Sequence, residues 1–213
     1  MCCSTMKTKS LNVIRRNTRQ SQQGFTLIEA LIAFAVLSFG VMGIISLLTM
    51  SKTSQLLALQ HTRAVTLSDA IIERIRANPA GLGIYNTGTD APVGGETIKA
   101  EPAPDCQTAA CSPDELAIHD MWAWEQALNG AGATVEGANT AGLRDPRGCI
   151  AFTAAPGLTR SGQLTVYVQW RGLTETFDAV QDDEQTCGGM KAGEDKYRRQ
   201  VVVNTYVLDA AEL

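Results

Sequence analysis

The stretch GFTLIE at residues 24–29, followed directly by the apolar run ALIAFAVLSFGVMGIISLLTMS at residues 30–51, decides the fold of this chain. The apolar run is 22 residues long and holds no charged side chain. An α-helix of that length rises about 33 Å, and the hydrocarbon layer of a bilayer is about 30 Å thick. We therefore predict a membrane-spanning helix over this run.

The segment before the apolar run is basic and contains the expected processing site. Residues 1–24 include no Asp or Glu and five basic residues, Lys7, Lys9, Arg15, Arg16 and Arg19. A secretory signal peptide has its small-residue cleavage site after its own apolar stretch. Here the only suitable small residue, Gly24, precedes that stretch. Cleavage after Gly24 would therefore leave the hydrophobic helix on the mature protein.

Charge divides the chain at the same point. Residues 25–213 carry 13 basic residues (18 less the five above) against 22 acidic ones, a formal charge of −9. Basic residues flanking a span stay cytoplasmic, so we expect the acidic remainder to lie across the membrane. This negative charge also argues against a nucleic-acid-binding face, which needs clustered Lys and Arg.

Glu29 is the unusual residue at the head of the span. A carboxylate there costs free energy, about 2.5–3.5 kcal/mol at the centre of a span and less near its end, and such residues are usually functional. Cleavage after Gly24 creates a partner for it, the α-amine of Phe25, either within one helix or between staggered neighbouring helices. The alternative is an uncleaved signal anchor in which Glu29 lies at the level of the lipid headgroups.

The GFTLIE string behind a short basic leader resembles the class III signal of type IV pilins and pseudopilins. The resemblance implies that a prepilin peptidase cuts between Gly24 and Phe25 and methylates the new N-terminal Phe25. It also implies that Glu29 assists assembly by pairing with the amine of a neighbouring subunit. The motif covers a small part of the chain and is highly specific.

Beyond the span, the helical pattern continues but becomes amphipathic. Apolar residues recur at helical spacing, at Leu57, Ala64, Leu67, Ile71 and Ile75. The pair Asn78-Pro79 ends the pattern, because Pro disfavours a helical residue before it. We expect one helix of about 78 Å if it is unbroken. Gly40 and Gly43 within the span mark either a stretch that bends during assembly or close packing of helices through small residues.

The rest of the chain predicts a small α+β head. We expect a surface loop over residues 79–111, a helix opened by the capping box of Ser112 and Glu115, and a second loop over residues 129–142. The buried face of that helix is predicted as Leu116, Met121, Trp122 and Leu128, with Trp124 half-exposed. Strands are predicted over residues 149–153, 163–170 and 200–208, with a polar loop over residues 178–197 before the last.

Four cysteines, Cys106, Cys111, Cys149 and Cys187, fall in the exported part, where an even count favours disulfides. Of the three possible pairings we favour Cys106–Cys111, which closes a small loop, and Cys149–Cys187, which ties a distant loop to a strand. A zinc site formed by Cys106, Cys111 and His119 is the alternative use of the first pair. We expect no metal and no cofactor, and we assign Cys2 and Cys3 no role.

Within the pilin family, the second half of the chain most resembles PilV-type minor pilins. The supporting features are Asp105-Cys106 with Cys111, the helix bearing Asp114, Leu116, Trp122 and Leu128, and the strand from Leu164 to Trp170. The resemblance implies the type IV pilin fold, a long protruding N-terminal helix packed on a small antiparallel sheet with disulfide-tied loops. We find no catalytic constellation, so we expect a protein that is processed by an enzyme rather than an enzyme.

The expected protein is a minor pilin that joins other minor pilins, the major pilin and the inner-membrane assembly platform, and primes a pilus used in adhesion or twitching motility. The expected parts are a cleaved leader (1–24), a transmembrane half-helix (25–51), an amphipathic half-helix (52–78) and a periplasmic head (79–213). Its place is the inner membrane and then the filament, at the tip. The alternatives are a minor pseudopilin of a type II secretion system, a DNA-uptake pilin with a basic patch at Lys196, Arg198 and Arg199, and a membrane-tethered enzyme.

Overall fold

The computed structural model describes residues 24–176, 187–188 and 195–212. The basic leader (1–23), including Cys2 and Cys3, and most of the predicted polar loop over residues 178–197 therefore lie outside the described residues. The chain forms two compact units, residues 1–48 and residues 49–213, and the boundary falls within helix α1 (Leu27–Ala77). Each unit is described by itself below.

The predicted long helix is present as α1, and its end lies where the sequence indicates. Asn78 leaves the helical conformation, with φ −135°, and Pro79 opens a short 3₁₀ turn, η1 (Pro79–Gly81), followed by α2 (Leu82–Tyr85). The helix is regular through Gly40 and Gly43. In the second unit its buried residues are Ala64, Ser68, Ile71, Ile72 and Ile75, which follow the predicted apolar stripe.

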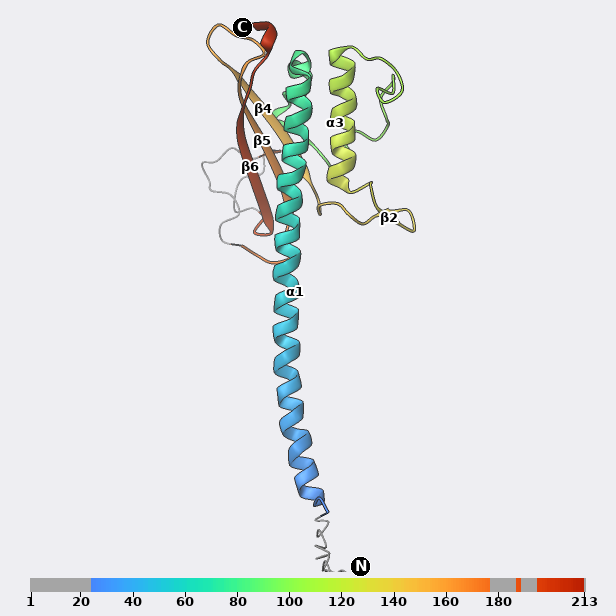
Figure 1. The fold of residues 1–213 in the computed structure, drawn as a ribbon, viewed down its shortest axis with the longest axis vertical. Helices are drawn as coiled ribbons and strands as arrows, with labels where there is room; N and C mark the ends of the chain where they lie inside the picture. Colours follow the sequence, from blue (N-terminus) through green and yellow to red (C-terminus); the bar gives the residue numbers. More distant parts are fainter. Residues whose placement is uncertain (1–23, 177–186, 189–194, 213) are drawn as a thin grey trace, which may run out of the picture. The chain divides into compact units, whose positions relative to one another are not determined.

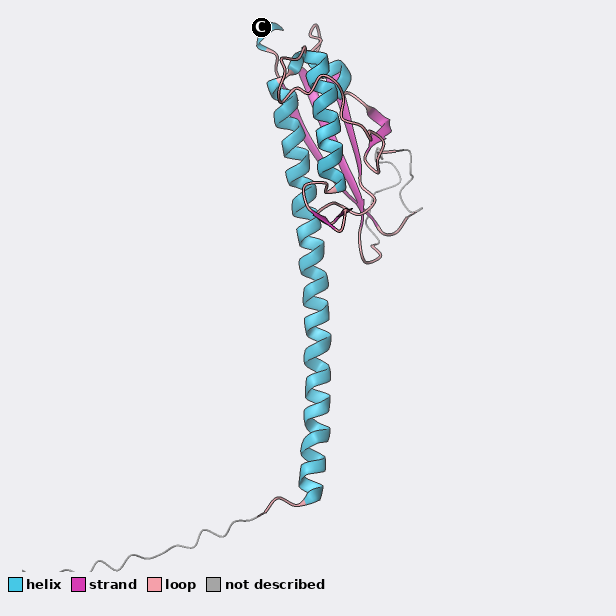
Figure 2. Ribbon diagram, turned by 90° about the vertical axis from the view of Figure 1, so that its right-hand side faces the viewer, coloured by secondary structure: helices cyan, strands magenta, loops and turns pink. Residues whose placement is uncertain are grey.

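The sheet of the second unit has four antiparallel strands in the order β1-β4-β5-β6. Their bounds are β1 (Gly88–Val93), β4 (Arg147–Ala154), β5 (Gly162–Arg171) and β6 (Arg198–Val207). The three predicted strands correspond to β4, β5 and β6. The alternation in β5 places Leu164, Val166, Val168 and Trp170 in the core, all at most 2 % exposed. The later part of α1 and helix α3 (Pro113–Asn129) lie side by side against this face (Figures 1 and 2).

Helix α3 begins at the predicted capping box. The Ser112 hydroxyl accepts a hydrogen bond from the Glu115 N–H (3.3 Å), and the Glu115 carboxylate accepts one from the Ser112 N–H (2.8 Å). These bonds satisfy two N–H groups that a helix start leaves without partners. The bond from the Ser112 N–H, followed by one from the Ser112 hydroxyl to the same carboxylate (2.8 Å), holds the pKa of Glu115 below its usual range. Gly130, at φ 76°, ends the helix in the left-handed conformation that glycine accommodates best.

The buried face of α3 differs from the prediction. Its apolar core residues are Ala117, Met121, Trp124 and Leu128, at steps of four, three and four. Leu116 and Trp122 are only half-buried, whereas Trp124 is 2 % exposed, so the predicted roles of the two tryptophans were the wrong way round. The helical period explains the difference, because Trp124 shares a face with Met121 and Leu128 and Trp122 does not.

The loop predicted over residues 79–111 is wrong in its first part. Besides η1 and α2, this region contributes β1, which pairs with β4 through Gly88 opposite Ile150 and Val93 opposite Gly148. Leu82, Tyr85 and Val93 enter the core. The pairing is irregular between its two ends, which fits a Gly- and Pro-containing edge strand. The second predicted loop, residues 129–142, contains a small hairpin of β2 (Thr134–Val135) and β3 (Ala138–Asn139).

Both disulfides follow the pairing favoured from the sequence, Cys106–Cys111 and Cys149–Cys187. The second lies on the sheet face opposite the helices, where Cys149, Tyr167 and Cys187 form a small buried cluster. The side-chain amide of Gln169 can exchange two hydrogen bonds with the main chain of Cys187 (3.1 and 3.3 Å). Cys187 is therefore held to this face by a covalent bond and by polar contacts.

The last residues of the chain are fastened to the turn before β5. The Glu212 carboxylate accepts hydrogen bonds from the Thr159 hydroxyl (2.6 Å) and from the N–H groups of Thr159 and Arg160 (both 2.8 Å). These contacts, with the Thr159 hydroxyl the largest, lower the pKa of Glu212 to about 2. Arg160 also forms an ion pair with Asp209 (2.7 Å).

Replacement of Gly148 by alanine should destabilise the head strongly. A Cβ atom at Gly148 would lie 2.3 Å from Cη2 of Trp124, whose indole N–H donates to the Leu67 carbonyl (3.0 Å) and therefore cannot shift freely. Such overpacking costs about 1–3 kcal/mol or more. We expect Gly148→Ala to lower the thermal unfolding midpoint of the full-length protein in detergent micelles. Gly132→Ala is the control, since a Cβ atom at that position would meet no atom within 4 Å, and it should change little.

Glu212→Gln should remove a pH-dependent part of the stability. Because the folded pKa of Glu212 is lowered to about 2, its contribution is complete above the unfolded value of about 4.3 and is lost as the pH falls through about 2. We expect the midpoint difference between wild type and Glu212→Gln to be largest at neutral pH and to shrink between about pH 4.3 and pH 2. A difference that stays constant over this range, as a purely steric effect would give, contradicts the assignment.

Candidate functional site: the amino-terminal segment

The start of α1 is organised by Thr26. Its carbonyl accepts hydrogen bonds from the N–H groups of Glu29 (3.1 Å) and Ala30 (3.2 Å), and its hydroxyl lies 3.4 Å from the Glu29 nitrogen. Thr26 is therefore the N-cap of the helix, a role that the sequence analysis missed. The T-x-x-E spacing of Thr26 and Glu29 is the signal that could have revealed it, because it has the form of a capping box.

The capping places Glu29 in the first turn of α1. A carboxylate there is favoured by the positive end of the helix dipole, so Glu29 is compatible with the helix despite its apolar surroundings. Gly24, Phe25, Thr26 and Glu29 line one hollow at this end of the first unit. The structure thus brings together the predicted cleavage residues, Gly24 and Phe25, and the predicted assembly residue, Glu29.

The apolar side chains that follow are exposed all around the helix. Phe25, Leu27, Phe34 and Phe39 are between 70 % and 85 % exposed, and the large apolar side chains from Val41 to Met50 are between 44 % and 71 % exposed. The most apolar window of α1 has a mean hydropathy of 2.5 and none of it is buried, so this helix is long and apolar enough to cross a membrane. An exposed apolar surface of this extent is a site for lipid or for other proteins.

Polar groups within the apolar segment find partners in the helix itself. The Ser38 hydroxyl donates to the Phe34 carbonyl (2.7 Å), the residue one turn earlier. In a bilayer an unsatisfied hydroxyl would cost several kcal/mol, so this internal bond makes Ser38 compatible with the span. By sequence, Glu29 is the one ionisable side chain in the described residues from 24 to 51.

The predicted basic patch for DNA uptake consists of Lys196, Arg198 and Arg199, and two of these side chains are engaged within the protein. Arg198 is buried and pairs with the Asp145 carboxylate, while donating to the Asp145 carbonyl (2.7 Å). Arg199 donates to Thr174, to its carbonyl (3.1 Å) and to its hydroxyl (3.2 Å). Only Lys196 of the three is exposed, so this patch lacks the clustered charge that phosphates require.

The two histidines lie in different environments. His61 is on the exposed side of α1, as predicted, and its ring meets that of Trp170 edge-on with centroids 6.3 Å apart. His119 is buried on α3, and in the described part of the chain it belongs to the group of potential metal ligands Glu101, Asp105 and His119. The predicted alternative of a zinc site with Cys106 and Cys111 is wrong, because those cysteines are joined to each other.

A polar network joins the end of α1 to α3 within the second unit. Asp120 accepts hydrogen bonds from Arg74 (2.7 Å) and from the Tyr85 hydroxyl (2.5 Å). Burial, followed by this bond to Asp120, raises the pKa of Tyr85 far above its usual value. Asn78 adds a bond to the Pro113 carbonyl (2.7 Å), which links the last turn of α1 to the start of α3. These contacts have a structural role and lie outside the amino-terminal segment.

Two protein families match this chain. The family described as type IV pilin Tt1218 matches residues 49–122, and the prokaryotic N-terminal methylation motif matches residues 19–45. Comparisons with curated proteins and with solved structures find no significant match. The first family match spans the later part of α1 through the first half of α3, and the second includes the GFTLIE string and most of the apolar run. Over these residues the chain is similar to type IV pilins, and its N-terminal methylation motif supports a pilin precursor that is processed by prepilin peptidase.

Proposed function

We propose that this protein is a minor pilin of a type IV pilus, of the PilV type, that takes part in priming pilus assembly and thereby in adhesion and twitching motility. The observation that supports this most is a capped carboxylate, Glu29, at the head of a helix whose apolar side chains are exposed on every side. Prepilin peptidase would cut between Gly24 and Phe25 and methylate Phe25. The pilin family is a structural one, in agreement with a role as a subunit rather than an enzyme.

The proposed organisation follows the sequence prediction. Residues 1–24 are the cytoplasmic leader, residues 25–51 the half-helix for membrane and filament core, residues 52–78 the amphipathic half-helix, and residues 79–213 the periplasmic head. The two disulfides support exposure of the head to an oxidising compartment. The acidic charge of the exported part supports the same orientation by the preference of basic residues for the cytoplasmic side.

The proposed mechanism is transfer of the apolar half-helix from lipid into the filament core. Each large side chain is surrounded by hydrocarbon before and after the transfer, so the hydrophobic effect contributes little to the direction of the process. Direction and register must come from polar groups and from the assembly platform. Glu29 is the ionisable group of the span, and the amine that cleavage exposes at Phe25 of a neighbouring pilin is the partner that satisfies it.

Loss of the Glu29 charge should leave membrane insertion intact but impair pilus assembly. Glu29→Ala and the near-isosteric Glu29→Gln leave the apolar run intact, so both variants should insert and be cleaved like wild type. Removing one partner of an ion pair shielded from water costs about 3–5 kcal/mol, so we expect at least a tenfold loss of piliation. The measurement is the amount of sheared surface pili and of inserted, cleaved protein in cells that lack the wild-type gene.

Ser38→Ala is the matched control, because Ser38 lies in the same span and its hydroxyl donates to the Phe34 carbonyl of its own helix. It should assemble normally. Normal piliation of Glu29→Gln would refute the proposed role of the carboxylate. If deletion of the gene abolished exoprotein secretion and left pili intact, the protein would be a pseudopilin of a type II secretion system instead.

A further inference from the structure

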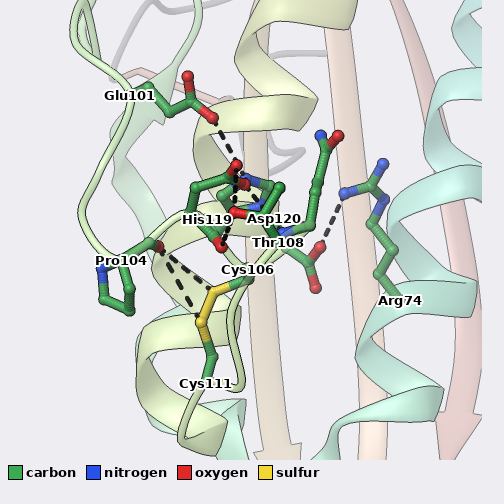
Figure 3. A network of polar contacts seen from close by, with 10 residues as sticks. Arg74, Glu101, Pro104, Cys106, Thr108, Cys111, His119 and Asp120 are labelled. Carbon is green, nitrogen blue, oxygen red and sulfur yellow. Dashed lines mark hydrogen bonds and ion pairs between the residues drawn. A yellow bond between two sulfur atoms is a disulfide. The ribbon is translucent and has the colours of Figure 1, made fainter.

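Three potential ligand side chains meet at one end of the loop between β1 and α3. Glu101 comes from this loop and His119 from the second turn of α3 (Figure 3). Asp105 comes from the same loop, directly before Cys106. One ligand atom from each, the Nε2 of His119 and one carboxylate oxygen from each acid, lie within 4.8 Å of one another. Residues that are 18 apart along the chain thus converge on one point through the fold rather than through a sequence motif.

The His119 ring nitrogen is buried and has no hydrogen-bond partner. The side chain is 5 % exposed, and Nε2 lies 3.7 Å from Glu101 Oε1 and 3.7 Å from Asp105 Oδ1. Both distances are too long for hydrogen bonds. A buried polar atom without a partner costs about 1–3 kcal/mol, so its position between two carboxylates requires an explanation.

The loop between β1 and α3 that carries Glu101 and Asp105 is restrained by contacts on both sides of these residues. Glu125, fully buried on α3, accepts hydrogen bonds from the Thr97 hydroxyl (2.8 Å) and from the Ile98 N–H (2.6 Å), which fixes the segment leading to Glu101. The Cys106–Cys111 disulfide closes the segment after Asp105. The carboxylates therefore belong to a restrained loop rather than to a free surface strand of acidic residues.

Asp105 is itself oriented by its neighbours. The N–H of Gln107 donates to Oδ1 (2.9 Å) and the Thr108 hydroxyl donates to Oδ2 (2.9 Å). These two bonds fix the orientation of the Asp105 carboxylate toward His119. Outer hydrogen bonds to a ligating carboxylate are typical of metal sites.

The spacing and the ligand types favour a zinc-type ion. Tetrahedral ligands at about 2.1 Å from Zn²⁺ lie about 3.4 Å apart, close to the distances from His119 Nε2 to the two acids. An imidazole nitrogen suits zinc and similar transition metals, whereas Ca²⁺ and Mg²⁺ prefer ligand sets made of oxygen alone. The side chains of Glu101 and Asp105 are 47 % and 41 % exposed, so an ion can enter from solvent and keep a water as its fourth ligand.

Neighbouring groups do not compete for this role. Cys106 and Cys111 are joined in a disulfide, and the carboxylate of Asp120, next to His119 in the chain, accepts a hydrogen bond from Arg74 (Figure 3). The same carboxylate accepts a second bond from the Tyr85 hydroxyl. We propose that Glu101, Asp105 and His119 bind one Zn²⁺ ion that fastens the disulfide-closed loop to α3. This inference is independent of the role of the amino-terminal segment in assembly.

The test uses the full-length chain in detergent micelles, with disulfides intact and metal removed by a chelator. Cys2→Ser and Cys3→Ser are introduced first, because free thiols in the leader would bind zinc themselves. Calorimetric titration with Zn²⁺ should show one ion per chain and a rise in the thermal midpoint. Glu101→Gln and Asp105→Asn should each weaken binding at least about tenfold, as expected from losing one of three ligands.

Two variants separate ligand loss from unfolding. Glu101→Gln changes a half-exposed side chain and should leave the thermal midpoint of the metal-free protein unchanged. His119→Gln is less suitable, because a substitution at a buried position can lower that midpoint by itself. Glu96→Gln is the matched control in the same loop, where Glu96 contacts only Lys99 at 3.9 Å among the ion pairs of the described residues, and it should bind Zn²⁺ like the parent. Absence of binding, binding unaffected by Glu101→Gln, or Ca²⁺ bound more tightly than Zn²⁺ would each overturn the proposal.

Discussion

The apolar surface of the first part of α1 is the constraint on which the rest of this protein depends. Burying one large apolar side chain is worth about 1.5–3 kcal/mol, and here such side chains are exposed all around the helix from Leu27 to Met50. No single face of a small head can cover a surface that points in every direction. A segment of this kind calls for apolar surroundings on every side, such as lipid or other apolar helices. A polar group within it, Glu29, therefore acquires an importance that it would lack on an ordinary surface.

The second part of α1 is buried along one stripe only. From Ala64 to Ile75 only one stripe is buried, and that stripe meets α3 and the inner face of β5. Trp124 lies at the centre of this contact, against Gly148 on one side and the Leu67 carbonyl on the other. The outer face of the sheet is covered in part by Cys187, held by its disulfide. The head thus combines a packed core with covalent fastening of its irregular segments, which is typical of small domains outside the cytosol.

Patterns within one element predicted most of this fold, and contacts between distant segments account for what was missed. The period-two alternation of residues 164–170 and the Ser112 and Glu115 capping box were sufficient for β5 and for the start of α3, because each depends on local geometry. Strand β1 was missed because an edge strand with Gly and Pro has no alternation to detect and is defined by its pairing with β4. The burial of Trp124 rather than Trp122 is the exception, because the helical period of α3 was sufficient to indicate it. Of the candidate site, Gly24, Phe25 and Glu29 came from the motif, whereas Glu101 and Asp105 beside His119 required the fold.

The proposed assembly mechanism requires that the apolar helix remain on the mature protein, with a new amine near Glu29. Mass spectrometry of the protein purified from its host's pili or inner membrane tests it most directly. The expected N-terminal peptide begins at Phe25 and carries one methyl group. A mature chain that begins downstream of residue 51, or one that retains residues 1–24, would contradict it.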